Sequence, residues 1–140
     1  MPLRPGRRAR RGVGLGDPAD PRLWKLDRTT ARIVAEVRLP FVVRHLAVGD
    51  DAVWVTDELG DRVVRIDPST LRQTDAVPVG RGAEGVAAGA GRIWVANAID
   101  GTVSRVDPEH RRVDATISVG GHPEDLAVAD GTIWVAADGA

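Results

Sequence analysis

The stretch Asp51–Gly80, DAVWVTDELGDRVVRIDPSTLRQTDAVPVG, decides the fold because the chain repeats it. It returns 40 residues later over Gly91–Gly120 as GRIWVANAIDGTVSRVDPEHRRVDATISVG, and a further copy begins at Gly131 as GTIWVAADGA. Tryptophan and aspartate each recur at this spacing, at Trp54, Trp94 and Trp134 and at Asp27, Asp67 and Asp107. A fixed period of about 40 residues predicts a repeat architecture.

One full period indicates four short β-strands. In the second copy we expect them at Glu84–Ala88, Arg92–Asn97, Thr102–Asp107 and Val113–Val119. No segment has the apolar spacing of an amphipathic helix, so we expect almost no helix.

The connections between these strands are short and rich in Asp, Gly and Pro. Asp100-Gly101 and Asp130-Gly131 are Asx-Gly pairs, which favour type I′ hairpin turns. Asp67-Pro68 and Asp107-Pro108 place proline at the second position of a turn, where its fixed φ fits. Each period is therefore expected to fold as an antiparallel meander.

The second strand of each period is apolar at every successive position, as in Val53-Trp54-Val55 and Ile93-Trp94-Val95. Successive side chains of a strand point to opposite faces, so both faces of this strand must be covered. Blades packed side by side around an axis cover both faces, which favours a β-propeller. We therefore expect the tryptophans to pack between blades rather than to bind a ligand, with Trp94 mostly buried and Trp134 less so.

The pattern E-G-V-A-x-G-x-G-R-I-W-V-A-N-x-x-D-G-T-V-S-R-V-D-P, over Glu84–Pro108, resembles the YVTN-type propeller repeats. It is also similar to the blades of virginiamycin B lyase. The resemblance implies a bacterial protein and a closed ring of about six to eight blades. This chain supplies about three blades. We therefore expect either a fragment of a longer protein or, as the alternative, a homo-oligomer in which two chains close a six-blade ring.

The expected organisation is a disordered basic leader followed by one propeller segment. The leader covers residues 1–11 and the segment covers 12–140. Within the segment we place a degenerate blade at about 12–40, full blades at about 41–80 and 81–120, and a partial blade at about 121–140.

Composition excludes several classes of function. The chain has no cysteine, which excludes disulfides and thiolate metal sites. Its 19 basic and 20 acidic residues nearly cancel, so no overall field points to nucleic acid or to an anionic membrane. No apolar run is long enough for membrane insertion, and no apolar signal-peptide segment follows the basic start. The compartment stays open.

The resemblance to the lyase implies an acid/base pair, with a His at the start of the innermost strand and a Glu three residues after the Trp. The residues here at the His position are Arg44, Glu84 and Glu124, and those at the Glu position are Asp57, Asn97 and Ala137. No copy carries the His–Glu pair, and the nearest substitutes, Glu84 with Asn97 and Arg44 with Asp57, offer no base with a near-neutral pKa unless their surroundings shift it strongly. This departure speaks against lyase activity of this segment.

The remaining candidate ligand-binding groups lie beside these positions. His45 follows the carried-over position by one residue and His122 precedes it by two, whereas His110 falls in a turn. A metal site needs three or four converging ligands, which His122, Glu124 and Glu84 could supply across adjacent blades. We favour instead solvated loop histidines and carboxylates that bond backbone amides between blades, and we expect no metal and no cofactor. The candidate ligand-binding residues are Arg44, His45, Asp57, Glu84, Asn97, His122 and Glu124.

We interpret the chain as a non-enzymatic module that binds an unidentified small molecule or protein, as a sensor or scaffold part of a larger bacterial protein. The alternative is a lyase-like or lactonase-like propeller enzyme whose catalytic blades lie outside this chain.

Overall fold

The computed structural model describes residues 20–139 and divides the chain into two units, one through Val42 and one from Val43. In the first unit, β2 (Arg22–Leu26) and β3 (Ile33–Arg38) form an antiparallel hairpin. The Trp24 indole donates a hydrogen bond to Glu36 on the facing strand at 2.6 Å. The expected basic leader and the start of the degenerate blade lie outside the described residues.

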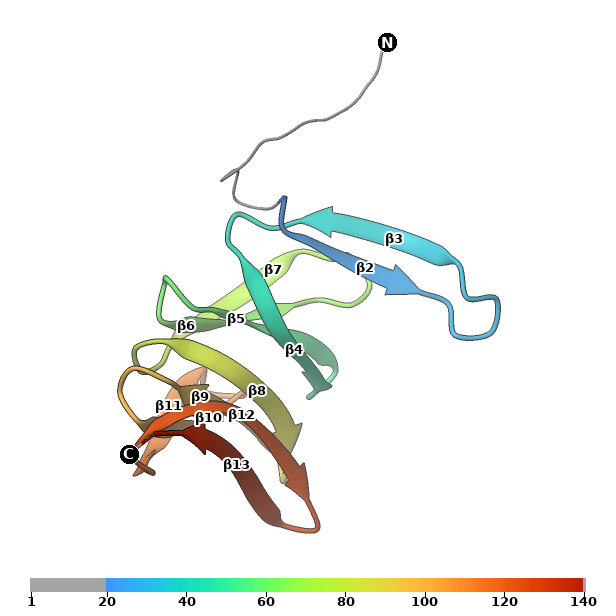
Figure 1. Ribbon diagram of the computed structural model, residues 1–140. Coiled ribbons are helices and arrows are strands. Elements are labelled where there is room, and N and C mark those ends of the chain that lie inside the picture. The colour runs from blue at the N-terminus through green and yellow to red at the C-terminus, as the bar shows by residue number, and fades with distance from the viewer. Residues whose placement is uncertain (1–19, 140) are drawn as a thin grey trace. The chain divides into compact units, whose positions relative to one another are not determined.

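The second unit contains two complete four-stranded antiparallel sheets and a two-stranded sheet (Figure 1). The first sheet has the order β4-β5-β6-β7, with the bounds Val43–Gly49, Ala52–Asp57, Arg62–Ile66 and Gln73–Pro78. The second has the order β8-β9-β10-β11, with the bounds Ala83–Gly89, Arg92–Asn97, Thr102–Asp107 and Arg112–Ser118. The third contains β12 (His122–Ala129) and β13 (Thr132–Asp138).

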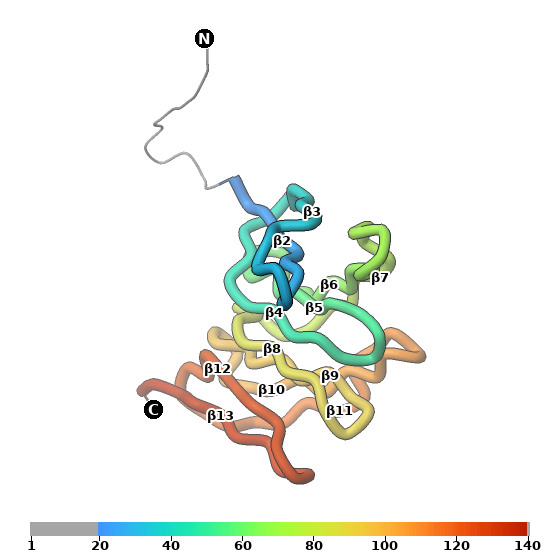
Figure 2. Tube along the Cα trace, turned by 90° about the vertical axis from the view of Figure 1, so that its right-hand side faces the viewer, coloured from blue at the N-terminus to red at the C-terminus, as the bar shows by residue number. Residues whose placement is uncertain are grey.

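Each full period is therefore a meander of four antiparallel strands, which confirms the predicted fold class. The first strands of the three sheets, β4, β8 and β12, lie side by side in the second unit (Figure 2). The strands expected in the second copy are all present, and their bounds differ by at most one residue at either end. The described residues contain no helix, and hence none that could span a membrane.

The hairpins between first and second strands have two successive residues with positive φ, as a type I′ turn requires. Asp130-Gly131 has φ values of 50° and 75°, as predicted, and Ala90-Gly91 and Asp50-Asp51 turn in the same way. Asp100-Gly101 was predicted as a second such pair, and this prediction is wrong. Only Gly101 has positive φ, because this connection is a longer turn that the Gly101 amide closes on the Asn97 carbonyl at 2.9 Å.

The repeated aspartates cap the turns between the third and fourth strands. The Asp107 carboxylate accepts hydrogen bonds from the amides of Glu109 and His110 at 3.0 and 3.2 Å. The His110 ring also lies 2.7 Å from the same carboxylate, and this contact lowers the pKa of Asp107 to about 2. Asp27 and Asp67 accept the corresponding amide bonds in their own turns. The 40-residue spacing of aspartate therefore reflects a repeated turn.

Each repeated tryptophan is buried to the extent that the sheet following it in the chain covers it. Trp54 is fully buried in a core that includes Ala83, Val86 and Val95 of the second sheet. Trp94 is partly buried and packs toward Leu126 of the two-stranded sheet, and Trp134 is 67% exposed. The predicted order of burial for Trp94 and Trp134 is confirmed, although Trp94 is less enclosed than Trp54. The position thus serves packing between neighbouring sheets.

Candidate ligand-binding site

A β-bulge interrupts the start of each innermost strand at the same repeat position. The register shifts between Val43 and Leu46 in β4 and between Ala83 and Val86 in β8. In β12 it shifts between Pro123 and Asp125. A bulge adds an unpaired residue and redirects the side chains around it. The candidate residues Arg44, Glu84 and Glu124 all lie within these bulges.

The second set of candidate positions lies at the same end of the sheets. In the antiparallel registers, Asp57 faces Val43 and Asn97 faces Ala83. Ala137 likewise faces Pro123. Both sets of positions therefore lie at one end of three neighbouring sheets. At this end we call the following group of residues the mouth: Arg44, Glu84, His122, Glu124 and Asp138.

The Asp57 carboxylate is already bound within its own sheet. It is 5% exposed, accepts a hydrogen bond from the Arg62 guanidinium at 2.8 Å, and accepts another from the Gly60 amide at 3.1 Å. Both interactions hold the carboxylate within its own sheet. The structure therefore separates Asp57 from the mouth, and a ligand-binding role for it stays a prediction.

Asn97 is also internal. Its side chain is fully buried, and its amide nitrogen donates to the hydroxyls of Thr102 and Ser104 at 3.1 and 2.9 Å. The structure thus directs Asn97 to the neighbouring strand β10 of its own sheet, and sequence reasoning, which considered Asn97 only as a partner of Glu84, missed Thr102 and Ser104.

Carboxylates converge at the mouth between β8 and β12. Glu124 shares a hydrogen bond with Asp138, and Glu84 is close enough to interact with it electrostatically. The pKa of Glu124 is raised above its ordinary value. The causes, largest first, are the hydrogen bond and the charge of Asp138, burial, and the charge of Glu84, whereas His122 opposes the shift. Asp138 was missed from the sequence, although its position opposite His122 in the hairpin register could have indicated it.

Backbone packing fixes these bulges. The Thr56 hydroxyl of the first sheet donates to the Glu84 carbonyl of the second at 2.6 Å. Gly85 lies against β12, where an added Cβ would come within 2.8 Å of the Glu124 carbonyl oxygen. A side chain at Gly85 would therefore push the two acidic bulges apart.

The basic and imidazole candidates differ in their surroundings. Arg44 forms an exposed ion pair with Glu58 at 3.2 Å. His122 is exposed on β12, with its Nδ1 atom 3.1 Å from the Ala98 carbonyl. His45 is partly buried, and its Nδ1 atom is buried without a hydrogen-bond partner. Within residues 20–139, no group of three or more His, Asp or Glu side chains is arranged to hold a metal ion.

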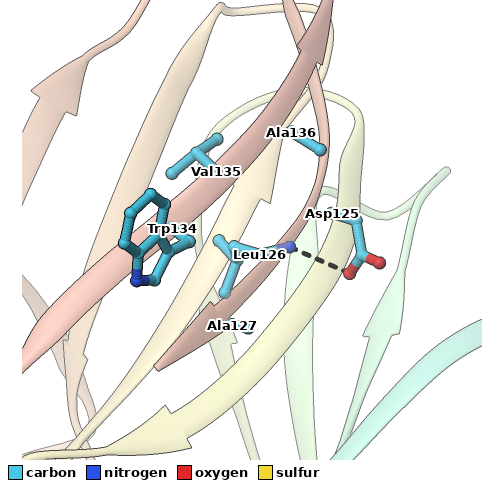
Figure 3. A pocket seen from close by; sticks show the side chains of 6 residues that line it. All are labelled: Asp125, Leu126, Ala127, Trp134, Val135 and Ala136. Atoms are coloured by element: carbon cyan, nitrogen blue, oxygen red, sulfur yellow. Dashed lines mark hydrogen bonds between the residues drawn. The ribbon is translucent and has the colours of Figure 1, made fainter. Parts of the chain in front are cut away.

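A second feature is an apolar hollow on the two-stranded sheet, with a volume of about 250 Å³ (Figure 3). Trp134, Val135 and Leu126 line it, and the Leu126 amide donates to the Asp125 carboxylate at 2.9 Å. The hollow lies beside Trp134. At the equivalent repeat position in the first sheet, Trp54 is covered by the second sheet. It therefore corresponds to the packing surface between neighbouring sheets rather than to a preformed pocket.

Comparisons with known proteins support the fold. No protein-family profile and no curated protein sequence matches the chain. Staphylococcus aureus virginiamycin B lyase matches with a TM-score of 0.66 and 19% identity, over 81% of this chain and 41% of the lyase. BamB from Moraxella catarrhalis matches with a TM-score of 0.70 and 21% identity, over 84% and 35% of the two chains.

Kuenenia stuttgartiensis hydrazine synthase matches with a TM-score of 0.66 and 26% identity, over 69% of this chain and 29% of that one. The chain thus spans less than half the length of each of these three proteins. A shared scaffold with such different names identifies a β-propeller fold and no particular activity.

Proposed function

We propose that the chain is a non-enzymatic binding module, part of a larger propeller protein, and that it recognises its partner at the mouth. The observation that supports this most is the state of the two groups that the complete sheets carry where the lyase resemblance implies a Glu. Asp57 is bound by Arg62, and Asn97 is bound by two hydroxyls. Neither residue presents a free base, whereas the bulges present carboxylates at the mouth.

The charge of the mouth indicates the kind of partner. Glu84, Glu124 and Asp138 are close enough for their charges to interact. A positive group placed among them would relieve this repulsion, and close opposite charges favour the ionised carboxylates. The proposed partner is therefore a small molecule or protein segment that presents an amine or guanidinium. The assignment to YVTN-type repeats and a bacterial source remain part of this proposal.

The test is calorimetric titration with a short peptide of alternating lysine and glycine. The proposal predicts binding that weakens with salt and falls at least several-fold in Glu84→Gln, because one of the converging charges is removed. Glu109→Gln is the matched control, since it removes the same charge from an exposed turn at the other end of the sheets. Equal loss in both variants would indicate attraction to overall charge and would reject the mouth as the site.

The alternative function is a lyase-like or lactonase-like enzyme whose catalytic blades lie outside this chain. One observation favours it: the raised pKa of Glu124 suits a proton donor at the mouth. An elimination assay on a cyclic depsipeptide lactone, with and without magnesium, distinguishes the two functions. The binding proposal predicts no turnover from this chain, and turnover that Glu84→Gln or Glu124→Gln abolishes would reverse the choice.

A further inference from the structure

We propose a second binding site, separate from the mouth, in the cleft between the first and second four-stranded sheets. Its ligand would be a small, neutral, polyhydroxylated molecule such as a pyranose sugar. The cleft has a volume of about 420 Å³, within the range of small-molecule sites. Its lining comes from the end of the first sheet and the outer strands of the second, and consists of Pro78, Val79, Gly80, Asp100, Thr102, Ser104, Val113 and Thr116.

A buried amide with an unmet hydrogen bond lies beneath this lining. Asn97 is fully buried, and its Oδ1 atom has no hydrogen-bond partner. Its Nδ2 atom donates to Thr102 and Ser104, two residues of the cleft wall. Exchanging the amide oxygen and nitrogen would leave the nitrogen unpaired instead, so the deficit does not depend on the orientation of the amide. A buried polar atom left unpaired points to a missing partner, either water or a ligand.

The two hydroxyls have hydrogen-bonding capacity to spare. Thr102 and Ser104 each accept a hydrogen bond from Asn97, so each retains a hydroxyl hydrogen that can be donated. Gly80 packs directly on this amide, because an added Cβ would lie 2.7 Å from Cγ and Nδ2 of Asn97. Glycine at position 80 therefore lets the end of the first sheet lie against the wall that carries the two hydroxyls.

The first sheet shows that this arrangement is not required by the blade. At the repeat positions of Asn97, Thr102 and Ser104 it carries Asp57, Arg62 and Val64. There the guanidinium of Arg62 pairs with the Asp57 carboxylate at 2.8 Å, and Val64 is fully buried. The second sheet thus replaces an ion pair and an apolar core residue with one amide and two hydroxyls. This joint replacement converts a closed packing position into a polar wall.

The composition of the lining indicates a neutral ligand with one apolar face. Hydroxyl groups come from Thr102, Ser104 and Thr116, and apolar surface comes from Pro78, Val79 and Val113. The one carboxylate, Asp100, is bound by the backbone amide and the guanidinium of Arg81, at 2.9 and 2.8 Å. No unpaired charge therefore calls for an ionic ligand. A sugar ring combines hydroxyls at its rim with a C–H face that packs on apolar side chains.

The test is saturation-transfer NMR on the 140-residue chain with glucose, galactose, mannose and N-acetylglucosamine, and with cyclohexanol as the apolar probe. The proposal predicts that at least one sugar binds with a dissociation constant of about 1 mM to 10 mM, the range of weak single-site ligands. Cyclohexanol should bind more weakly than that sugar. Absence of sugar binding at concentrations well above this range, or preference for cyclohexanol, would overturn the proposal.

Variants then locate the site. Ser104→Val introduces the residue that the first sheet carries at this position and should weaken sugar binding at least tenfold. Ser118→Val is the matched control, because Ser118 is exposed on β11 and does not line the cleft. If Ser104→Val does not fold, Thr116→Val removes an exposed hydroxyl of the lining and should still weaken binding. Unchanged affinity in a folded cleft variant would show that the sugar binds elsewhere.

Discussion

Replacing Trp54 with alanine tests how the sheets are held together. The side chain is fully buried, lies in a core shared with the second sheet, and donates from its indole nitrogen to the Gly49 carbonyl at 3.1 Å. Truncation of a fully buried aromatic costs about 3–5 kcal/mol, and the loss of the indole hydrogen bond favours the upper part of that range. We therefore expect Trp54→Ala to lower the free energy of unfolding by about 4 kcal/mol.

The other two tryptophans supply the internal comparison. Trp94 makes the equivalent bond to Gly89 at 3.2 Å but is only partly buried, so Trp94→Ala should cost about 2–3 kcal/mol. Trp134 is 67% exposed, and its removal should change stability by about 0.5 kcal/mol or less. Urea denaturation followed by circular dichroism measures all three. Equal costs at the three positions would refute the reasoning that the next sheet buries this residue.

The pKa of Asp107 is lowered to about 2 because His110 and the turn amides favour the carboxylate. The stability that this contributes is present above pH 3.8, the ordinary pKa, and is lost as the pH falls through about 2. Asp107→Asn should therefore flatten the dependence of Tm on pH in this interval, and an unchanged slope would contradict the cap. The raised pKa of Glu124 has the opposite effect on stability. Its contribution to stability is present below pH 4.5, the ordinary pKa, and is lost as the pH rises through the raised pKa. Glu124→Gln should accordingly raise Tm at neutral pH with little effect below pH 4.5, whereas a lower Tm at neutral pH would argue against carboxylate crowding. Exposed Trp134, Leu46 and Val48 should make the chain associate or precipitate, which size-exclusion chromatography with light scattering can show, and a stable monomer at high concentration would contradict this.

The fold could be predicted because the repeat itself carries the information. Alternation along Val53-Trp54-Val55 required cover on both faces, and recurring Asp and Gly residues marked where each strand turns. The Asp100-Gly101 turn was misassigned because an Asx-Gly pair alone does not determine the length of the turn that it ends. The actual connection uses Gly101 at its last position and leaves Asp100 to bind Arg81.

The site was harder to predict because a position in the repeat does not give the direction of its side chain. The bulges in β4, β8 and β12 bring Arg44, Glu84 and Glu124 to the mouth, and only the strand registers reveal them. Asp57 and Asn97 share one repeat position but bind different partners, because position 62 is arginine and position 102 is threonine. Asp138 was overlooked because the lyase resemblance directs attention to the preceding residue, Ala137.

The most direct test of recognition at the mouth is an amide NMR titration of the chain with the alternating lysine–glycine peptide. The largest shift changes should fall at residues 82–85, 122–125 and 138, where the acidic bulges and Asp138 lie. They should fade in Glu84→Gln and persist in Glu109→Gln. Changes centred on the opposite turns, at 89–92 and 107–112, or no saturable changes at all, would contradict it.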